Sequence, residues 1–70
     1  MNTIAISIPA APDLQELLIA QLSEVGFDGF EQTDRELFAY INEPDFRAAE
    51  LTLILNQHNL TYTESIISKT

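Results

Sequence analysis

The sequence predicts a single α+β domain, residues 1–70, in which two helices cover one face of a four-stranded antiparallel sheet. Three observations favour this two-layer sandwich. Apolar residues alternate near both ends of the chain, as in half-buried strands. Two stretches between those ends change to helical spacing, and a hairpin pattern separates the two stretches. The expected element order is therefore β-α-β-β-α-β.

The first predicted strand, residues 2–8, alternates apolar side chains with small or polar ones. Pro9 and Pro12 are expected to end it, because proline cannot donate a hydrogen bond to the sheet. The side chains expected on the buried face of this strand are those of Ile4, Ile6 and Ile8.

A first helix is predicted over residues 13–25, where apolar residues recur at helical spacing. We expect Asp13 and Glu16 to form a capping-box-like start. Gly26 is expected to adopt the left-handed conformation that ends many helices. The predicted buried stripe of the helix consists of Leu14, Leu17, Leu18, Leu22 and Val25.

Residues 27–41 predict a hairpin in which the polar segment DRE turns the chain. A loop formed by Asp34 and Arg35 would set the register and divide the side chains between two faces. The expected opposite pairs are Gln32 with Leu37, Phe30 with Ala39 and Gly29 with Tyr40. The face under the helices would then carry Phe30, Leu37, Ala39 and Ile41. The uncovered face would carry Thr3, Ala5, Ser7, Phe38, Tyr40 and Glu31, the last beside Phe38.

A second helix is predicted over residues 44–58, with Pro44 and Asp45 in its first turn and Asn59 as its left-handed stop. Its buried side is expected to include Phe46, Ala49 and Leu53, with Leu51, Ile54 and Leu55 as further candidates. Residues 60–67 alternate and are rich in Thr, Tyr and Ile, which predicts a last strand. This order of elements is that of the ferredoxin-like fold, in which the strands usually lie 4-1-3-2.

Composition limits the partners that the domain can bind. Three basic residues against eleven acidic ones give a net charge of −8, so the surface should repel nucleic acid and attract a basic protein. The same acidity is also expected if it serves only to keep the domain soluble. The chain has no apolar run long enough to span a membrane, and the absence of cysteine fits a reducing, cytoplasmic compartment.

No arrangement of residues predicts catalysis or a metal site. His58 has no acidic residue three or four positions away, and it is expected to be a surface or capping residue. The serines lack a neighbouring base, and no glycine-rich loop suits a phosphate. We therefore expect no catalytic, cofactor-binding or metal-ligating residue in this chain.

Phe38 and Tyr40 are the residues that the fold prediction leaves without a role. Aromatic side chains on an uncovered sheet face suggest a contact surface, and Glu31 would lie beside them. The two rings could instead cover each other or a second copy of the chain. RNA-binding modules also use aromatics on such a face, but the basic residues that accompany them are missing here. The candidate protein-contact residues are Phe38, Tyr40 and Glu31.

The segments ELLIAQLSEVGFDGFEQT, LFAYI and LTYTESI resemble the N-terminus of a known enzyme family. The resemblance covers residues 4–66 and is to the methyltransferases of the Bacteroidetes type that modify ribosomal protein eleven of the large subunit. It implies a ferredoxin-like substrate-recognition domain that binds a basic ribosomal protein. It also implies a separate catalytic domain, absent from this chain, that binds S-adenosylmethionine and contacts this domain.

The chain ends at Thr70, before the linker and catalytic domain of that family, so it resembles one domain of a longer enzyme and would not methylate by itself. Glu36 stands where family members often carry glycine, which leaves the type of hairpin turn open. The alternative function is a free-standing ferredoxin-like module that forms a homodimer or binds a small regulatory ligand.

Overall fold

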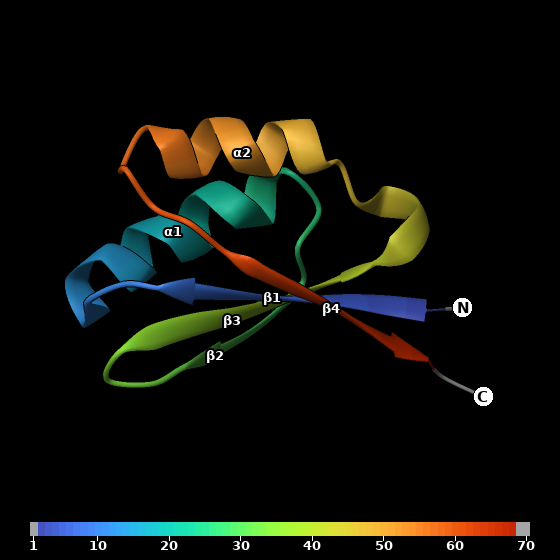
Figure 1. Cartoon of the computed structure of the whole chain (residues 1–70), viewed down its shortest axis with the longest axis horizontal. Coiled ribbons are helices and arrows are strands. Elements are labelled where there is room, and N and C mark those ends of the chain that lie inside the picture. Colours follow the sequence, from blue (N-terminus) through green and yellow to red (C-terminus); the bar gives the residue numbers. More distant parts are fainter. Residues whose placement is uncertain (1, 69–70) are drawn as a thin grey trace.

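The computed structural model describes the backbone of residues 2–68 and the side chains of residues 2–67. The fold is α+β, with a four-stranded antiparallel sheet and two α-helices on one face of it, as expected (Figure 1). The strands lie in the order β2-β3-β1-β4, so β2 and β4 form the two edges. The elements are β1 (Asn2–Pro9), α1 (Pro12–Glu24), β2 (Gly29–Gln32), β3 (Glu36–Asn42), the 3-10 helix η1 (Glu43–Asp45), α2 (Ala48–Asn56) and β4 (Thr63–Ser68).

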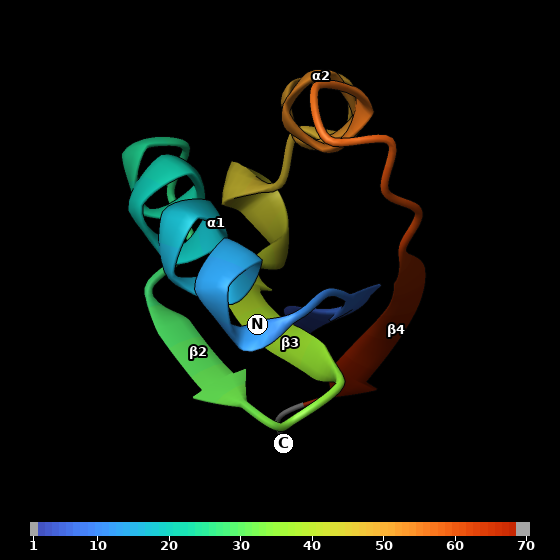
Figure 2. The same cartoon turned by 90° about the vertical axis from the view of Figure 1, so that its left-hand side faces the viewer.

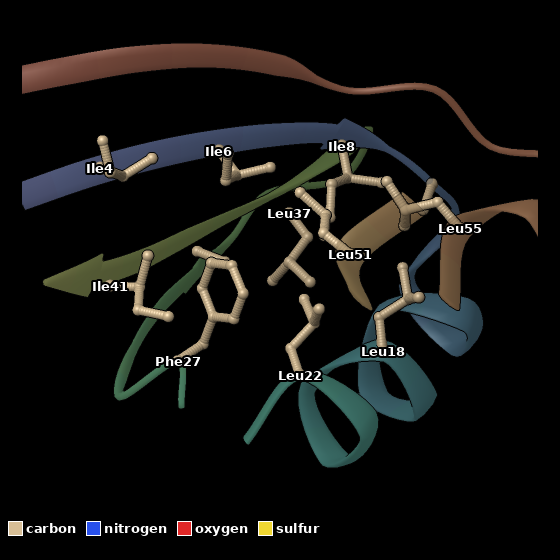
Figure 3. Packing of buried hydrophobic residues seen from close by; sticks show 12 residues of the cluster. Ile4, Ile6, Ile8, Leu18, Leu22, Phe27, Leu37, Ile41, Leu51 and Leu55 are labelled. Atoms are coloured by element: carbon tan, nitrogen blue, oxygen red, sulfur yellow. The ribbon is translucent and has the colours of Figure 1, made fainter. Parts of the chain in front are cut away.

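The hydrophobic core lies between the sheet and the two helices (Figure 3). Alternate residues of β1 and β3 supply its layer on the sheet side, as the period-2 pattern predicts. Leucines of both helices supply the opposite layer, and Phe27 enters from the segment between α1 and β2. The buried hydrophobic residues are Ile4, Ile6, Ile8, Ala10, Leu18, Leu22, Phe27, Leu37, Ala39, Ile41, Leu51 and Leu55.

Helix α1 begins without the predicted capping box. Its N-cap is Ala11, no side chain caps it, and Pro12 stands at its start, so the roles expected of Asp13 and Glu16 were wrong. Proline is well suited to this position because its missing N–H has no partner in the first turn of a helix. Asp13 lies in the first turn, where a negative charge is favourable.

The buried stripe of α1 differs from the predicted one at two positions. Leu17 is 48% exposed, because it lies about 100° around the helix from the buried Leu18. Gln15 is fully buried instead, and its Nε2 donates to the carbonyl oxygens of Ala10 at 2.8 Å and Thr33 at 2.9 Å. This amide therefore joins the loop after β1 to the hairpin between β2 and β3.

The end of α1 confirms the prediction for Gly26. Its φ of +106° is positive, and the N–H of Phe27 returns to the carbonyl oxygen of Leu22 at 3.2 Å. The N–H of Gly26 bonds to the carbonyl of Ser23, which completes a Schellman motif. The reversal carries Phe27 directly into the core.

The hairpin between β2 and β3 has the predicted register. Gly29 lies opposite Tyr40, Phe30 opposite Ala39, Glu31 opposite Phe38 and Gln32 opposite Leu37. The turn is stabilised by Thr33, whose Oγ1 accepts from the N–H groups of Arg35 and Glu36 and donates to the carbonyl of Glu36. Neither Asp34 nor Arg35 has a positive φ, so this turn needs no glycine, and the hydroxyl satisfies its amides.

Helix α2 is shorter than predicted and presents a different face to the core. Pro44 and Asp45 belong to the 3-10 helix η1, and α2 starts at Ala48. Leu51 and Leu55, which were secondary candidates, are buried at i and i+4. The expected Ala49 and Leu53 are exposed, because Leu53 lies about 200° around the helix from Leu51. Phe46 packs against the core from the segment between η1 and α2.

The prediction that Asn59 ends this helix in the left-handed conformation is confirmed by its φ of +56°. The N–H of Leu60 then bonds to the carbonyl of Leu55 at 3.0 Å. The last strand begins three residues later than predicted, at Thr63. The partly buried Leu60 and Tyr62 pack against the core before that strand starts.

Candidate protein-contact face

The sheet has one face under the helices and one face that no helix of the described chain covers (Figure 2). Strand pairing assigns the side chains to this second face, which we call the open face. Phe38 and Tyr40 lie at its centre on β3, as predicted. The open face consists of Thr3, Ala5, Ser7, Pro9, Gly29, Glu31, Glu36, Phe38, Tyr40, Asn42, Thr63, Ser65 and Ile67.

Tyr40 has a structural role that the sequence did not reveal. A Cβ placed on Gly29 would lie 3.5 Å from both Cβ and Cδ2 of Tyr40, so the tyrosine side chain lies over the glycine backbone. Aromatic residues opposite a strand glycine cover backbone that would otherwise be open to water. The signal was available, because the predicted register already paired Gly29 with Tyr40. Tyr40 is half-buried by this contact.

Phe38 has no comparable partner and is flanked by polar groups. Its neighbours across the two adjacent strands are Glu31 on β2 and Ser7 on β1. The Ser7 hydroxyl donates to Oε2 of Glu36 at 2.9 Å, which holds that carboxylate on the same face. The half-buried ring of Phe38 therefore lies among one serine and two carboxylates.

The charge of the open face is entirely negative. Glu31 and Glu36 are its charged members, and none of its residues is a lysine or an arginine. The basic residue closest in sequence, Arg35, lies in the exposed hairpin turn. An apolar centre with carboxylates beside it suits a partner surface that combines apolar and basic side chains. The structure therefore brings together the three candidate residues Phe38, Tyr40 and Glu31.

His58 contacts the other helix rather than any acidic residue. Its Nε2 lies 3.1 Å from Oε1 of Gln21, so the end of α2 is linked to α1. Among the described residues, no group of three His, Cys, Asp or Glu side chains is placed to hold a metal ion. No helix within residues 2–68 has the length and apolar character needed to cross a membrane.

One shallow pocket of about 250 Å³ lies beside the C-terminal half of α2. Its volume is below the roughly 300–1,000 Å³ of typical ligand pockets. Its lining contains no charged residue and no glycine-rich loop. The residues that line it are Thr52, Leu55, Asn56, Leu60, Thr61 and Tyr62.

Comparisons with known proteins give one informative match. No family model matches the chain, and no solved structure matches it. The chain is similar to the ribosomal protein L11 methyltransferase of Chlorobaculum tepidum, with 37% identity over 59 residues. The match covers 80% of this chain and 20% of that enzyme, so the chain spans about a fifth of its relative's length. Most of this chain is thus similar to a small part of a ribosomal protein methyltransferase.

Proposed function

We propose that this chain is the N-terminal substrate-recognition domain of a ribosomal protein methyltransferase and is not catalytic by itself. The similarity to the ribosomal protein L11 methyltransferase of Chlorobaculum tepidum carries this proposal. Because the match covers most of this chain but a fifth of that enzyme, the shared segment corresponds to a part of an enzyme rather than to a whole one. The pattern of residues 4–66 supports a member of the Bacteroidetes type.

The fold supports this assignment at the level of architecture. The element order and the sheet order are those expected of a ferredoxin-like domain. Such a domain presents a flat, rigid sheet face, and sites built on strands hold their side chains more firmly than sites on loops. S-adenosylmethionine would bind to the rest of the enzyme, which this domain would contact. The whole enzyme would act in the cytoplasm.

The open face is the surface that we assign to the ribosomal protein. Ribosomal proteins are commonly basic, and the charge of −8 on this chain would speed their association. Phe38 would supply the apolar contact, because a half-buried aromatic ring near the centre of a flat face is typical of interface anchors. Glu31, which lies opposite Phe38, would pair with a lysine or arginine at the rim of the contact.

The experiment is a titration of the labelled domain with purified ribosomal protein L11, followed by fluorescence anisotropy at low and high salt. Phe38→Thr introduces a β-branched residue, which suits a strand, and removes the ring. It should weaken binding about tenfold, the effect of losing one interface anchor. Glu31→Gln should weaken binding about threefold at low salt and less at high salt, since exposed pairs are screened.

The matched control is Glu50→Gln, which removes one exposed carboxylate from α2 on the opposite side of the sheet. Glu50→Gln removes the same charge as Glu31→Gln but lies away from the open face, so it should weaken binding less than Glu31→Gln does. Circular dichroism checks that each variant is folded. If Phe38→Thr binds like the unchanged domain, the open face is not the contact surface. If the domain shows no binding to the ribosomal protein at any salt concentration, the recognition role itself is wrong.

A further inference from the structure

The outer edge of β4 is a strand edge that the described chain leaves unpaired. The sheet ends at β4, whose only strand neighbour is β1. About half of the residues in an edge strand direct their N–H and C=O groups away from the sheet. Figure 2 shows β4 at the side of the molecule, away from β2. Six residues thus form a template for a further strand.

The two edges of the sheet differ in how they are protected. The β2 edge has four residues, which makes it a poor template, and its two last residues, Glu31 and Gln32, are polar and exposed. The sequence of β4, TESIIS, contains neither proline nor lysine. Its one charged residue is Glu64, which opposes a second acidic chain at this edge but not a basic segment. The edge of β4 is therefore the one that can accept another chain.

Two adjacent isoleucines give this edge apolar surface on both of its faces. Ile66 pairs with the buried Ile4 and points to the helix side, yet it is 56% exposed. Ile67 points to the open face and is 44% exposed. An added strand would place side chains next to each isoleucine, because side chains alternate between the two faces.

We propose that the β4 edge binds an extended segment of a basic partner protein by adding a strand to the sheet. The negative net charge of the domain favours a basic partner over a second copy of the chain. A second copy of the chain would bring another net charge of −8 to the same edge, whereas lysine or arginine side chains would be attracted. Glu64 is exposed within β4 and provides a specific point for such a side chain. This proposal does not rest on the methyltransferase assignment.

The test uses an eight-residue peptide of alternating lysine and valine with blocked ends, added to the isotopically labelled domain. Binding by strand addition should slow amide hydrogen exchange at those residues of β4 whose N–H groups face outward, by about tenfold or more at saturation. The control peptide has the same sequence and charge but carries N-methyl groups on every amide. It should bind about tenfold more weakly, because it has no N–H groups to donate.

A matched pair of variants locates the site on the domain. Glu64→Lys and Glu50→Lys change the net charge equally, but only the first lies on β4. Glu64→Lys should weaken peptide binding about fivefold more than Glu50→Lys does. Phe38→Thr should leave peptide binding unchanged, so that a failure of the open-face proposal does not affect this result.

Three outcomes would overturn the proposal. Equal binding of the methylated and unmethylated peptides would show attraction to charge alone. Unchanged exchange in β4 at saturating peptide would place the contact elsewhere. A dimer in sedimentation, paired through β4 without any peptide, would show that a second copy of the chain is the occupant.

Discussion

Replacing Gln15 by leucine tests the one buried polar residue among the described residues of this domain. The side chain has no exposed surface, and its Nε2 donates to two backbone carbonyls at 2.8 and 2.9 Å. The substitution keeps a similar volume but removes both donors. The carbonyl of Ala10 would lose a buried partner, whereas the exposed Thr33 would regain one from water.

The expected loss of unfolding free energy follows from the two hydrogen bonds that Gln15 donates. An unsatisfied buried carbonyl costs roughly 1–3 kcal/mol, and the more exposed bond contributes about 1 kcal/mol. Against this, Oε1 of Gln15 is buried without a hydrogen-bond partner, so removing it recovers about 1–2 kcal/mol. The net destabilisation of Gln15→Leu should be about 1–2 kcal/mol. For a domain of this size, that lowers the midpoint of thermal unfolding by about 5–15 °C.

The assay is urea unfolding followed by circular dichroism, with thermal unfolding as a second measurement. Gln57→Leu is the matched control, because that side chain is exposed and should change stability by less than about 0.5 kcal/mol. If Gln15→Leu is as stable as the unchanged domain, or more stable, the reasoning is refuted. The unpartnered oxygen would then cost more than the two donated bonds contribute.

Three further predictions concern the fold and use the same urea assay. Gly26→Ala should cost about 1–3 kcal/mol, because its φ of +106° is a conformation that residues with a side chain rarely adopt. A neutral result would contradict the role of Gly26 in ending α1. Leu51→Ala should lower the free energy of unfolding by about 2–5 kcal/mol, whereas Leu53→Ala should lower it by less than about 0.5 kcal/mol. A larger loss for Leu53→Ala than for Leu51→Ala would favour the buried face first predicted for α2. Gly29→Ala should leave stability unchanged or raise it by up to about 1 kcal/mol, since 3.5 Å to the ring above is an ordinary contact; a loss above 1 kcal/mol would show that the ring cannot adjust.

The strands were predictable because alternation of side chains is a local property. Ile4, Ile6 and Ile8 fix the buried face of β1 whatever pairs with it. The length of the polar segment at Asp34 and Arg35 then set the register of the hairpin, and with it the composition of the open face. The candidate contact residues followed from this register alone.

The orientation of α2 could not be predicted, because apolar residues lie on several sides of this helix. In AAELTLILN, several faces carry enough apolar residues to be buried, and contacts with the rest of the fold decide between them. The 3-10 helix at Glu43–Asp45 also shifts the start of α2, so that the first predicted turn lies outside it. Such shifts at helix starts depend on packing rather than on propensity.

Two other features depend on tertiary structure alone. Gln15 looks like a surface residue in the sequence, and only the approach of the hairpin turn to α1 explains its burial. The two isoleucines of β4 look like core residues, but strand order places them at an edge. The exposure of a strand depends on which strands flank it, and that is a property of the topology.

The sheet of this small domain can offer a broad recognition surface without weakening the core. A chain of 70 residues has little apolar surface to spare, and the buried hydrophobic residues within residues 2–67 all belong to one cluster. A deep pocket would remove contacts from that cluster, whereas an open sheet face and a strand edge use atoms that the core does not need. Strand β3 shows this separation, because Leu37, Ala39 and Ile41 build the core while Phe38 lies on the other face. Substitutions at Phe38 would therefore test the proposed partner contact while the residues on either side of it continue to hold the fold.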